Sequence, residues 1–314
     1  MALAVVAGAY VLFASPQAHA VLEIYLQDSS GRIGWVNASL PPGSPDQTPA
    51  GVFITTGNMA DIAFGTNNFL WGISNESAGA VLYKMNVFDG TGATQGASAQ
   101  TYWNTTASVT GLSVTYGGAT NNAINYNALT FAPANSGAGS GKLYAATISS
   151  GGSPSSATST LYSIDTTTGA ATVIGTFGAG IISSGDLAFA NWNGSSPGTL
   201  YANVNVGNSS VSQLASINLA TGAATVIGAY TGANGAFQGL ANSATNNGGL
   251  FSIDSQYVYS VNTSTGAGTQ LFKYTAGQVT SVRGAAAFGE AIPAPAALGI
   301  FGLGLAGLAL VRRR

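Results

Sequence analysis

The stretch LYSIDTTTGAATVIG, residues 161–175, predicts a β-hairpin. Its first strand alternates apolar residues with small or polar ones, which is typical of a strand with one buried face. Asp165 stands where it can close an Asx turn, and Gly169 supplies the positive φ that the turn requires. This hairpin is the clearest copy of a unit that recurs along the chain, and the predicted fold follows from the repetition.

Three other segments repeat the hairpin. LASINLATGAATVIG, residues 214–228, matches it closely, and VYSVNTSTGAGTQLF, residues 258–272, is a further copy. Asn218 and Asn262 take the place of Asp165, and Gly222 and Gly266 that of Gly169. LYKMNVFDGTGATQG, residues 82–96, is a weaker copy with two extra turn residues.

Two shorter strand signals precede each hairpin, first a small-apolar-aromatic triplet and then a Leu-aromatic pair. The triplets are Ile62-Ala63-Phe64, Leu129-Thr130-Phe131, Leu187-Ala188-Phe189 and, without its aromatic, Leu240-Ala241-Asn242. The pairs are Leu70-Trp71, Leu143-Tyr144, Leu200-Tyr201 and Leu250-Phe251. Each unit therefore has four strands. Successive triplets end 67, 58 and 53 residues apart, a spacing that favours propeller blades with loops of variable length.

The two ends of the repeat region complement each other. A last triplet, Ala286-Ala287-Phe288, has no hairpin after it, whereas residues 21–36 form a hairpin with no triplet before it. In a propeller the first and last strands complete one blade together, which removes open sheet edges. We therefore predict an all-β propeller of about five blades over residues 21–290, with residues 97–126 as a possible further partial blade. A β-sandwich is the alternative fold.

Composition excludes several classes of function. Only 18 of the 314 residues are charged, and the net charge of −2 gives no electrostatic basis for binding nucleic acid. The chain has no Cys, and its single His, His19, lies in the N-terminal segment that is predicted below to be removed, so the mature chain has neither residue. Disulfides, Cys/His zinc sites and Ser-His or Cys-His catalysis are therefore excluded. We predict no metal site and no cofactor.

The remaining candidates for chemistry are carboxylates. Asp165 is predicted to form a turn, and Asp61 and Asp186 each precede a triplet, where a carboxylate can cap the entry into a strand. A glycosidase needs two carboxylates about 5 to 10 Å apart, and no pair in the sequence is marked out for that role. We assign no catalytic residue and predict that the protein is not an enzyme.

Aromatic side chains are candidates for a ligand surface, because their rings present an apolar face to a sugar. Trp71 occupies a Leu-aromatic pair and is predicted to lie in the core. Trp103 and Trp192 fall in predicted loops, where binding residues concentrate. These two tryptophans are the predicted ligand surface.

The N-terminus has the pattern of a secretory signal peptide. Residues 2–14 are apolar, and Ala18 and Ala20 form a small-x-small cleavage site ahead of Val21. We predict that residues 1–20 are removed and that the mature chain begins at Val21. A buried N-terminal helix is the alternative.

The C-terminal segment, residues 291–314, combines Pro293-Ala294-Pro295, an uncharged stretch over residues 296–311, and Arg312, Arg313 and Arg314. Sixteen helical residues rise roughly 24 Å, which makes a marginal membrane span with its arginines on the cytoplasmic side. This arrangement resembles the PEP-CTERM sorting signal of Gram-negative bacteria. Ala294 stands where that signal has an acidic residue.

The resemblance implies an export route and a processing enzyme. PEP-CTERM signals are recognised by an exosortase, a membrane enzyme thought to cut near the prolines, and such substrates are associated with extracellular polysaccharide and biofilm. We therefore expect a transiently anchored protein that reaches the cell surface or the extracellular matrix without enzymatic activity. A carbohydrate-binding propeller and a carboxylate-based glycan hydrolase are the alternatives.

The terminal signals can be tested by fractionation. Replacing Arg312, Arg313 and Arg314 with Ala should loosen membrane retention before cleavage, because these charges stop the segment from passing through the bilayer. Removing Pro293 and Pro295 should leave the span intact and block processing, because a helix extended through the site hides the cut position. Release of the proline variant as efficient as that of the wild type would identify an ordinary membrane anchor.

Overall fold

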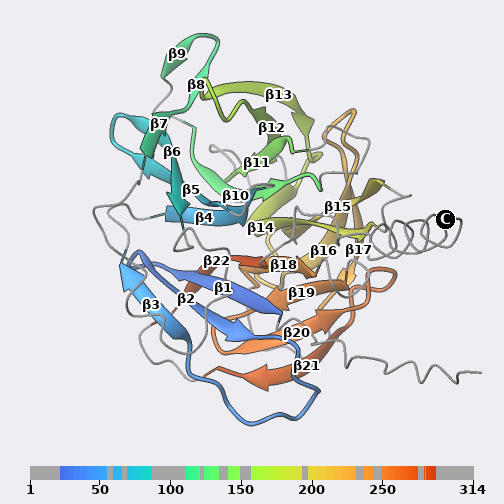
Figure 1. The fold of residues 1–314 in the computed structure, drawn as a ribbon. Coiled ribbons are helices and arrows are strands. Elements are labelled where there is room, and N and C mark those ends of the chain that lie inside the picture. The colour runs from blue at the N-terminus through green and yellow to red at the C-terminus, as the bar shows by residue number, and fades with distance from the viewer. Residues whose placement is uncertain are drawn as a thin grey trace, which may run out of the picture.

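The computed structural model describes residues 22–54, 59–65, 69–86, 110–120, 124–133, 141–148, 157–192, 197–230, 237–243, 249–274, 279 and 281–287. All regular structure in these ranges is β, with 22 strands in five sheets (Figure 1). The described residues contain no helix of the length and hydropathy needed to cross a membrane. The predicted signal peptide, residues 1–20, and the predicted sorting signal, residues 291–314, lie outside the described residues.

Each sheet is a blade whose first four strands are ordered from the axis outward. The innermost strands are β22 (Val282–Ala287), β4 (Met59–Phe64), β10 (Tyr126–Phe131), β14 (Ile181–Trp192) and β18 (Gly239–Ser243). The second strands are β1 (Glu23–Asp28), β5 (Phe69–Glu76), β11 (Leu143–Thr147), β15 (Pro197–Val206) and β19 (Gly249–Ile253).

The outer half of each blade is a further antiparallel pair. The third strands are β2 (Arg32–Asn37), β6 (Gly79–Asn86), β12 (Thr160–Ile164), β16 (Gln213–Ile217) and β20 (Tyr257–Val261). The fourth strands are β3 (Ala50–Ile54), β7 (Thr110–Ser113), β13 (Ala170–Thr176), β17 (Ala224–Ala229) and β21 (Gly268–Lys273). The order of triplet, pair and hairpin in the sequence is thus the order of strands in the blade.

The five blades close into a ring. Each innermost strand packs against the innermost strands of the two neighbouring blades, in the order β22, β4, β10, β14, β18 and back to β22. This arrangement confirms the predicted five-bladed propeller and excludes the β-sandwich. Closure occurs where β1 pairs antiparallel with β22, with Ile24 opposite Ala287 and Leu26 opposite Ala285. The predicted pairing of the two ends of the repeat region is therefore confirmed.

The register of the closing strand differs by one residue from the prediction. Ile24 opposes Ala287 as Leu70 opposes Phe64 in the next blade. The last triplet is therefore 285–287 and not 286–288. Three consecutive alanines give the pattern no large residue to fix its position, so only the pairing with β1 defines the register.

The second blade also differs from the prediction. Its fourth strand is β7, which pairs with β6, so the partner of the strand predicted at residues 82–86 lies later in the chain than residue 96. Residues 97–126 do not form a blade of their own in the part that the structure describes. Thr110–Ser113 completes the second blade, and β8 (Thr115–Tyr116) and β9 (Ala119–Thr120) extend the third, where β8 pairs parallel with β13.

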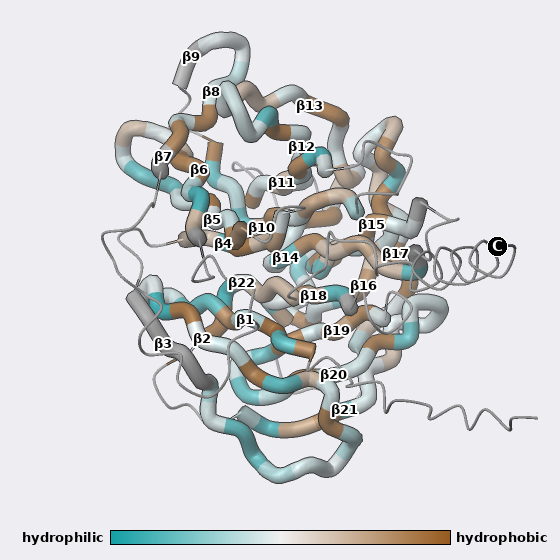
Figure 2. Tube along the Cα trace, viewed as in Figure 1, coloured by the Kyte–Doolittle hydropathy of each residue, from teal (hydrophilic) through white to brown (hydrophobic). Residues whose placement is uncertain are grey.

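The hydrophobic core is divided among the five interfaces between blades. Apolar residues lie along the strands, and Figure 2 shows them in brown. An aromatic residue of the triplet packs on the aromatic residue that precedes it in the neighbouring blade, with ring centroids 5.0 Å apart for Tyr25 and Phe64 and 5.8 Å apart for Trp71 and Phe131. Trp71 is buried, as predicted. The repeated Leu-aromatic pairs and triplets are therefore the packing units between blades.

The glycines of the hairpin have two separate functions. Gly169, Gly222 and Gly266 have φ values of 75°, 73° and 77°, and Oδ1 of Asp165, Asn218 or Asn262 accepts two backbone N–H groups in each turn. The predicted Asx turns are thus confirmed. The second glycine of the repeat, Gly175, has no positive φ, but a Cβ there would overlap the carbonyl oxygen of Thr221 in the next blade.

This close approach predicts the effect of adding one methyl group. Gly175→Ala should lower the free energy of unfolding by about 1–3 kcal/mol, because the backbones of two blades must separate to accommodate it. Gly268→Ala is the matched control, since its Cβ would lie 3.5 Å from Tyr259, an ordinary contact. Chemical denaturation measures both variants. Equal stability of the two would show that the blades do not touch at Gly175.

Candidate functional site

The axis of the propeller carries two buried aspartates at equivalent positions. Asp61 on β4 and Asp186 on β14 each directly precede a triplet, and neither is exposed to solvent. They lie on opposite sides of β10 in the ring of innermost strands, and their side chains hydrogen-bond to each other. The sequence predicts that each aspartate caps the entry into its own strand. The structure adds that the two carboxyl groups meet.

Five backbone N–H groups, one from each innermost strand, donate to these two carboxyl groups. Innermost strands have no partner strand on their axial edge, so their N–H groups need other acceptors. The bonds are Ile62 N to Asp61 Oδ1 at 2.8 Å, Leu129 N to Asp61 Oδ2 at 2.5 Å, Leu187 N to Asp186 Oδ1 at 2.7 Å, and Leu240 N and Ala285 N to Asp186 Oδ2 at 2.8 and 2.9 Å. The aspartates therefore connect all five blades.

Small residues on the other three strands make room for the two side chains. Ala128, Gly239 and Gly284 occupy the position that Asp61 and Asp186 occupy on their own strands. A Cβ at Gly284 would overlap Oδ1 of Asp61, so glycine is required there by the carboxyl group opposite. Among the five equivalent positions of the described innermost strands, the axis thus accommodates two carboxyl groups.

A hydrogen bond between two carboxyl groups requires a proton on one of them. Burial and the neighbouring carboxylate of Asp61 raise the pKa of Asp186 well above its usual range, and the N–H donors oppose this shift. Two carboxyl groups in direct hydrogen-bond contact also leave no room for a substrate between them, whereas the carboxyl groups of a glycosidase stand about 5 to 10 Å apart around the substrate. Asp61 and Asp186 consequently act as a structural pair, and the hydrolase alternative does not apply to them.

A cavity of about 260 Å³ lies at the end of the axis where the innermost strands begin. Ala60, Asn127, Gly185, Gln238 and Arg283, one residue from each blade, line it. The axial layer consists of Asp61, Asp186 and the three small residues at the equivalent positions. Each of the five lining residues directly precedes its strand's residue in that layer, four of them within a strand and Gln238 just before β18. We call this cavity the axial cavity. Its position makes it the one cavity described here to which every blade contributes.

Some polar groups around the axial cavity are already bonded. The side chain of Asn75 donates to the carbonyl oxygen of Tyr126 at 2.7 Å and accepts its N–H at 2.9 Å, so this amide fixes the start of β10. Nδ2 of Asn127 donates to the carbonyl oxygen of Ser183 at 3.0 Å. Ser184 Oγ lies 3.3 Å from Ser212 Oγ.

Other polar groups lining the axial cavity have no partner among the described residues. Oδ1 of Asn127 is buried and accepts no hydrogen bond there. The side chains of Gln238 and Arg283 form no hydrogen bond or ion pair with another described residue. Of these groups only Oδ1 of Asn127 is buried, whereas Gln238 is half-buried and Arg283 is exposed. A buried polar atom is normally paired, so the Asn127 oxygen needs an explanation. These three side chains are the groups available to a ligand.

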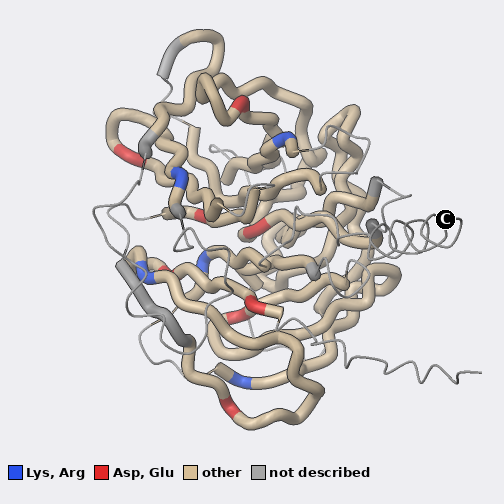
Figure 3. The backbone as a smooth tube through the Cα atoms, viewed as in Figure 1, with Lys and Arg blue, Asp and Glu red and all other residues tan. Residues whose placement is uncertain are grey.

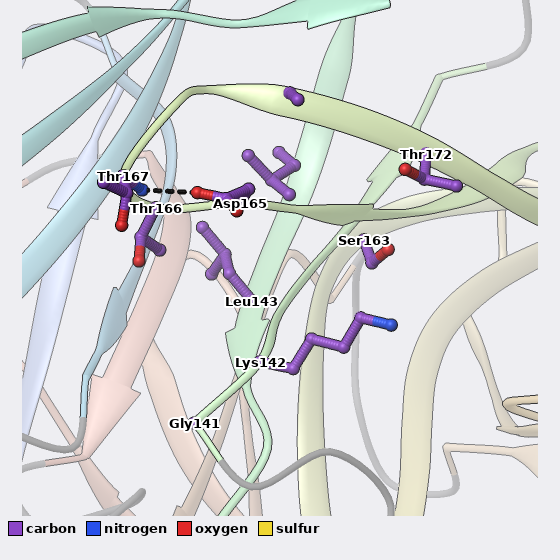
Figure 4. Close-up of a pocket in the computed structure, with 10 residues that line it drawn as sticks. Gly141, Lys142, Leu143, Ser163, Asp165, Thr166, Thr167 and Thr172 are labelled. Carbon is purple, nitrogen blue, oxygen red and sulfur yellow. Dashed lines mark hydrogen bonds between the residues drawn. The ribbon is translucent and has the colours of Figure 1, made fainter.

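A larger cavity of about 450 Å³ lies on the third blade, beside the end of β12 and the start of β13 (Figure 4). Lys142 and Asp165 line it. Asp165 accepts the N–H groups of Thr167 and Thr168 at 2.7 and 2.9 Å, which lowers the pKa of its carboxyl group. A single blade forms this cavity, and its carboxylate serves the turn, so we place the candidate site in the axial cavity.

Of the two tryptophans predicted to form a ligand surface, only Trp192 is among the described residues. Trp103 is outside the described residues. Trp192 ends β14, where its backbone pairs with Pro197, at the end of the strand remote from Ser184 and Gly185. Sequence analysis did not single out Asn127, Gln238 or Arg283. A signal exists, because each stands two residues before a triplet in the structural register, but the three share no residue type.

The axial pair predicts a pH dependence of stability. A pKa raised in the folded state contributes stability that is present below the unfolded value near 3.9 and is lost as pH rises through the folded pKa. Asp186→Asn should therefore cost most at low pH, about 1–3 kcal/mol from mismatched donors, and progressively less as pH rises. Unfolding free energies of wild type and variant across pH 4–8 measure this difference.

Asp165→Asn is the control with the opposite sign. The pKa of Asp165 is lowered in the folded protein, so its contribution is present above the unfolded pKa and is lost as pH falls. Asn218 and Asn262 show that asparagine fits this turn. A wild-type minus Asp186→Asn difference that is constant with pH would exclude a shared proton at the axis.

Comparisons with known proteins give the fold and no family. No family model matches the chain, and no curated protein matches it. A solved structure titled as a gluconolactonase from Xanthomonas campestris is 13% identical, with 81% of this chain and 80% of that chain covered and a TM-score of 0.44. A putative gluconolactonase is 10% identical over 84% of each chain, with a TM-score of 0.46.

A third structure, a calcium-binding regucalcin from Agrobacterium tumefaciens, is 14% identical and covers 81% of this chain and 74% of its own, with a TM-score of 0.37. The prediction that the chain is not an enzyme is contradicted by these neighbours, because proteins similar to it in structure include gluconolactonases, which are enzymes. The similarities otherwise extend to the propeller fold.

Proposed function

We propose that this chain is an exported propeller that binds a carbohydrate in its axial cavity. The observation that carries the proposal is a cavity to which all five blades contribute and which is lined by polar groups without a partner among the described residues. These groups are Oδ1 of Asn127 and the side chains of Gln238 and Arg283. Ligand sites are concave and combine apolar walls with a few placed polar groups. Ala60 and Ile148 supply apolar surface in the same cavity.

The size of the cavity limits the ligand. A volume of about 260 Å³ is smaller than the roughly 300–1,000 Å³ of pockets for drug-sized molecules. One sugar ring is of suitable size, and its hydroxyl groups can donate to Oδ1 of Asn127 and bond with the amide of Gln238. We infer that the ligand is a monosaccharide unit or the terminal residue of a longer glycan.

The terminal segments support the location in this proposal. The signal-peptide pattern ahead of Val21 and the PEP-CTERM-like segment from Pro293 to Arg314 both favour export and processing by an exosortase. A protein deposited outside the cell by this route meets extracellular polysaccharide, which is a source of the proposed ligand. Association with biofilm belongs to the same proposal.

Filling the axial cavity tests the assignment. Gln238→Trp should abolish saccharide binding by the purified full-length chain on a glycan array, because the indole occupies the space of a sugar ring. Val173→Trp is the control, since Val173 is 39% exposed on β13 and does not line the cavity. Equal thermal unfolding temperatures verify that both variants fold. Undiminished glycan binding by Gln238→Trp would place the ligand outside the axial cavity.

A receptor and an enzyme both begin by binding, so turnover needs its own assay. The full-length chain is incubated with sugar lactones and with the glycans that it binds, and product is followed by mass spectrometry. Turnover that disappears in Gln238→Trp and persists in Val173→Trp would assign catalysis to the axial cavity.

A further inference from the structure

Arg283 is the one cationic side chain among the described residues that line the axial cavity. It belongs to β22, and its side chain is exposed. Charged residues are few and scattered along the chain (Figure 3), and an arginine without a counterion at the axis is therefore a specific feature. Arg32, in contrast, is paired, with its Nε donating to Asp28 Oδ2 at 2.8 Å.

No carboxylate competes for Arg283 at the cavity wall. The described lining residues include no Asp or Glu. Asp61 and Asp186 lie one residue deeper on their strands, where their oxygens accept the five N–H groups and bond to each other. Arg283 forms no ion pair with either carboxylate. Its guanidinium group is thus available to a negatively charged ligand.

The backbone conformation just before Arg283 is constrained. Ser281, two residues earlier, has a φ of 55°, one of two positive values at non-glycine positions in the described chain. Such a conformation costs an L-residue about 1–2 kcal/mol and persists where the surroundings hold it. Val282, between the two residues, is buried. The arginine therefore follows a segment whose backbone conformation is constrained.

We propose that Arg283 makes the axial cavity selective for a saccharide that carries a carboxylate, such as a uronic acid residue. The inference rests on the proposed carbohydrate binding and names the class of sugar. Arginine pairs with a carboxylate through two parallel N–H···O bonds, which a neutral sugar cannot form. Asn127 Oδ1 and the Gln238 amide then bond to hydroxyl groups of the same ring.

Two probes that differ only at the exocyclic carbon C6 test the selectivity. Methyl β-glucuronide should bind the full-length chain about ten- to a hundredfold more tightly than methyl β-glucoside, as measured by isothermal titration calorimetry. Arg283→Gln should reduce this ratio to about one, and Arg283→Lys should retain part of it, since a lysine supplies the charge without the bidentate geometry.

Lys142→Gln is the matched control, because it removes the same charge from the other cavity and should preserve the ratio. Equal affinity for the two probes in the wild type, or a preference that survives Arg283→Gln, would overturn the role of Arg283 and leave carbohydrate binding intact. Failure of the wild type to bind either probe or any glycan would instead overturn the proposed function and this inference together.

Discussion

Two carboxyl groups accept the hydrogen bonds of five blades on the axis of this propeller. A ring of sheets leaves the axial edge of every innermost strand without a neighbouring strand, and a buried N–H group that makes no bond costs about 1–3 kcal/mol. Asp61 and Asp186 satisfy one such group on each strand with side chains from only two of them. The small residues at the other three positions leave room for these two side chains.

The same pair separates the axis into different environments. On one side of the aspartates lies the axial cavity, with Arg283, Gln238 and Asn127. On the other side the triplets bring Phe64, Phe131 and Phe189 into the interfaces between blades. At the inner end of the cavity a ligand thus meets carboxyl groups that already accept backbone hydrogen bonds. Its recognition therefore depends on the side chains that line the cavity wall.

The sequence predicts most of this fold because the repeat encodes it locally. Alternating residues, an Asx-turn residue and a glycine at positive φ define each outer hairpin without reference to the rest of the chain. The errors occur where that local signal is weak. The alanines of β22 do not fix a register, and the fourth strand of the second blade follows residues 87–109, which separate it from its hairpin partner.

The candidate site was not predictable in the same way. Asp61 and Asp186 stand at equivalent repeat positions, but their meeting depends on the packing of β4, β10 and β14 around the axis, which brings together residues 125 positions apart. Asn127, Gln238 and Arg283 differ in chemical type, so no motif connects them. Their common property is that each directly precedes the axial layer, and only the folded ring brings these positions together around one cavity.

The ring of blades can close only after β22 has been synthesised, because closure requires β22 to pair with β1. The final strand of the propeller is the last to be synthesised, yet it must join the first, and the backbone of Ala285 must reach Asp186 from 99 residues away. Contacts of such separation fold slowly, because the entropy of closing a long loop opposes them. Folding of the nascent chain is therefore expected to stop at an open arc with an exposed edge on β1. If the protein is exported as we propose, and if export precedes closure, the polypeptide crosses the membrane as this incomplete arc or as an unfolded chain. The axial cavity then first exists on the far side.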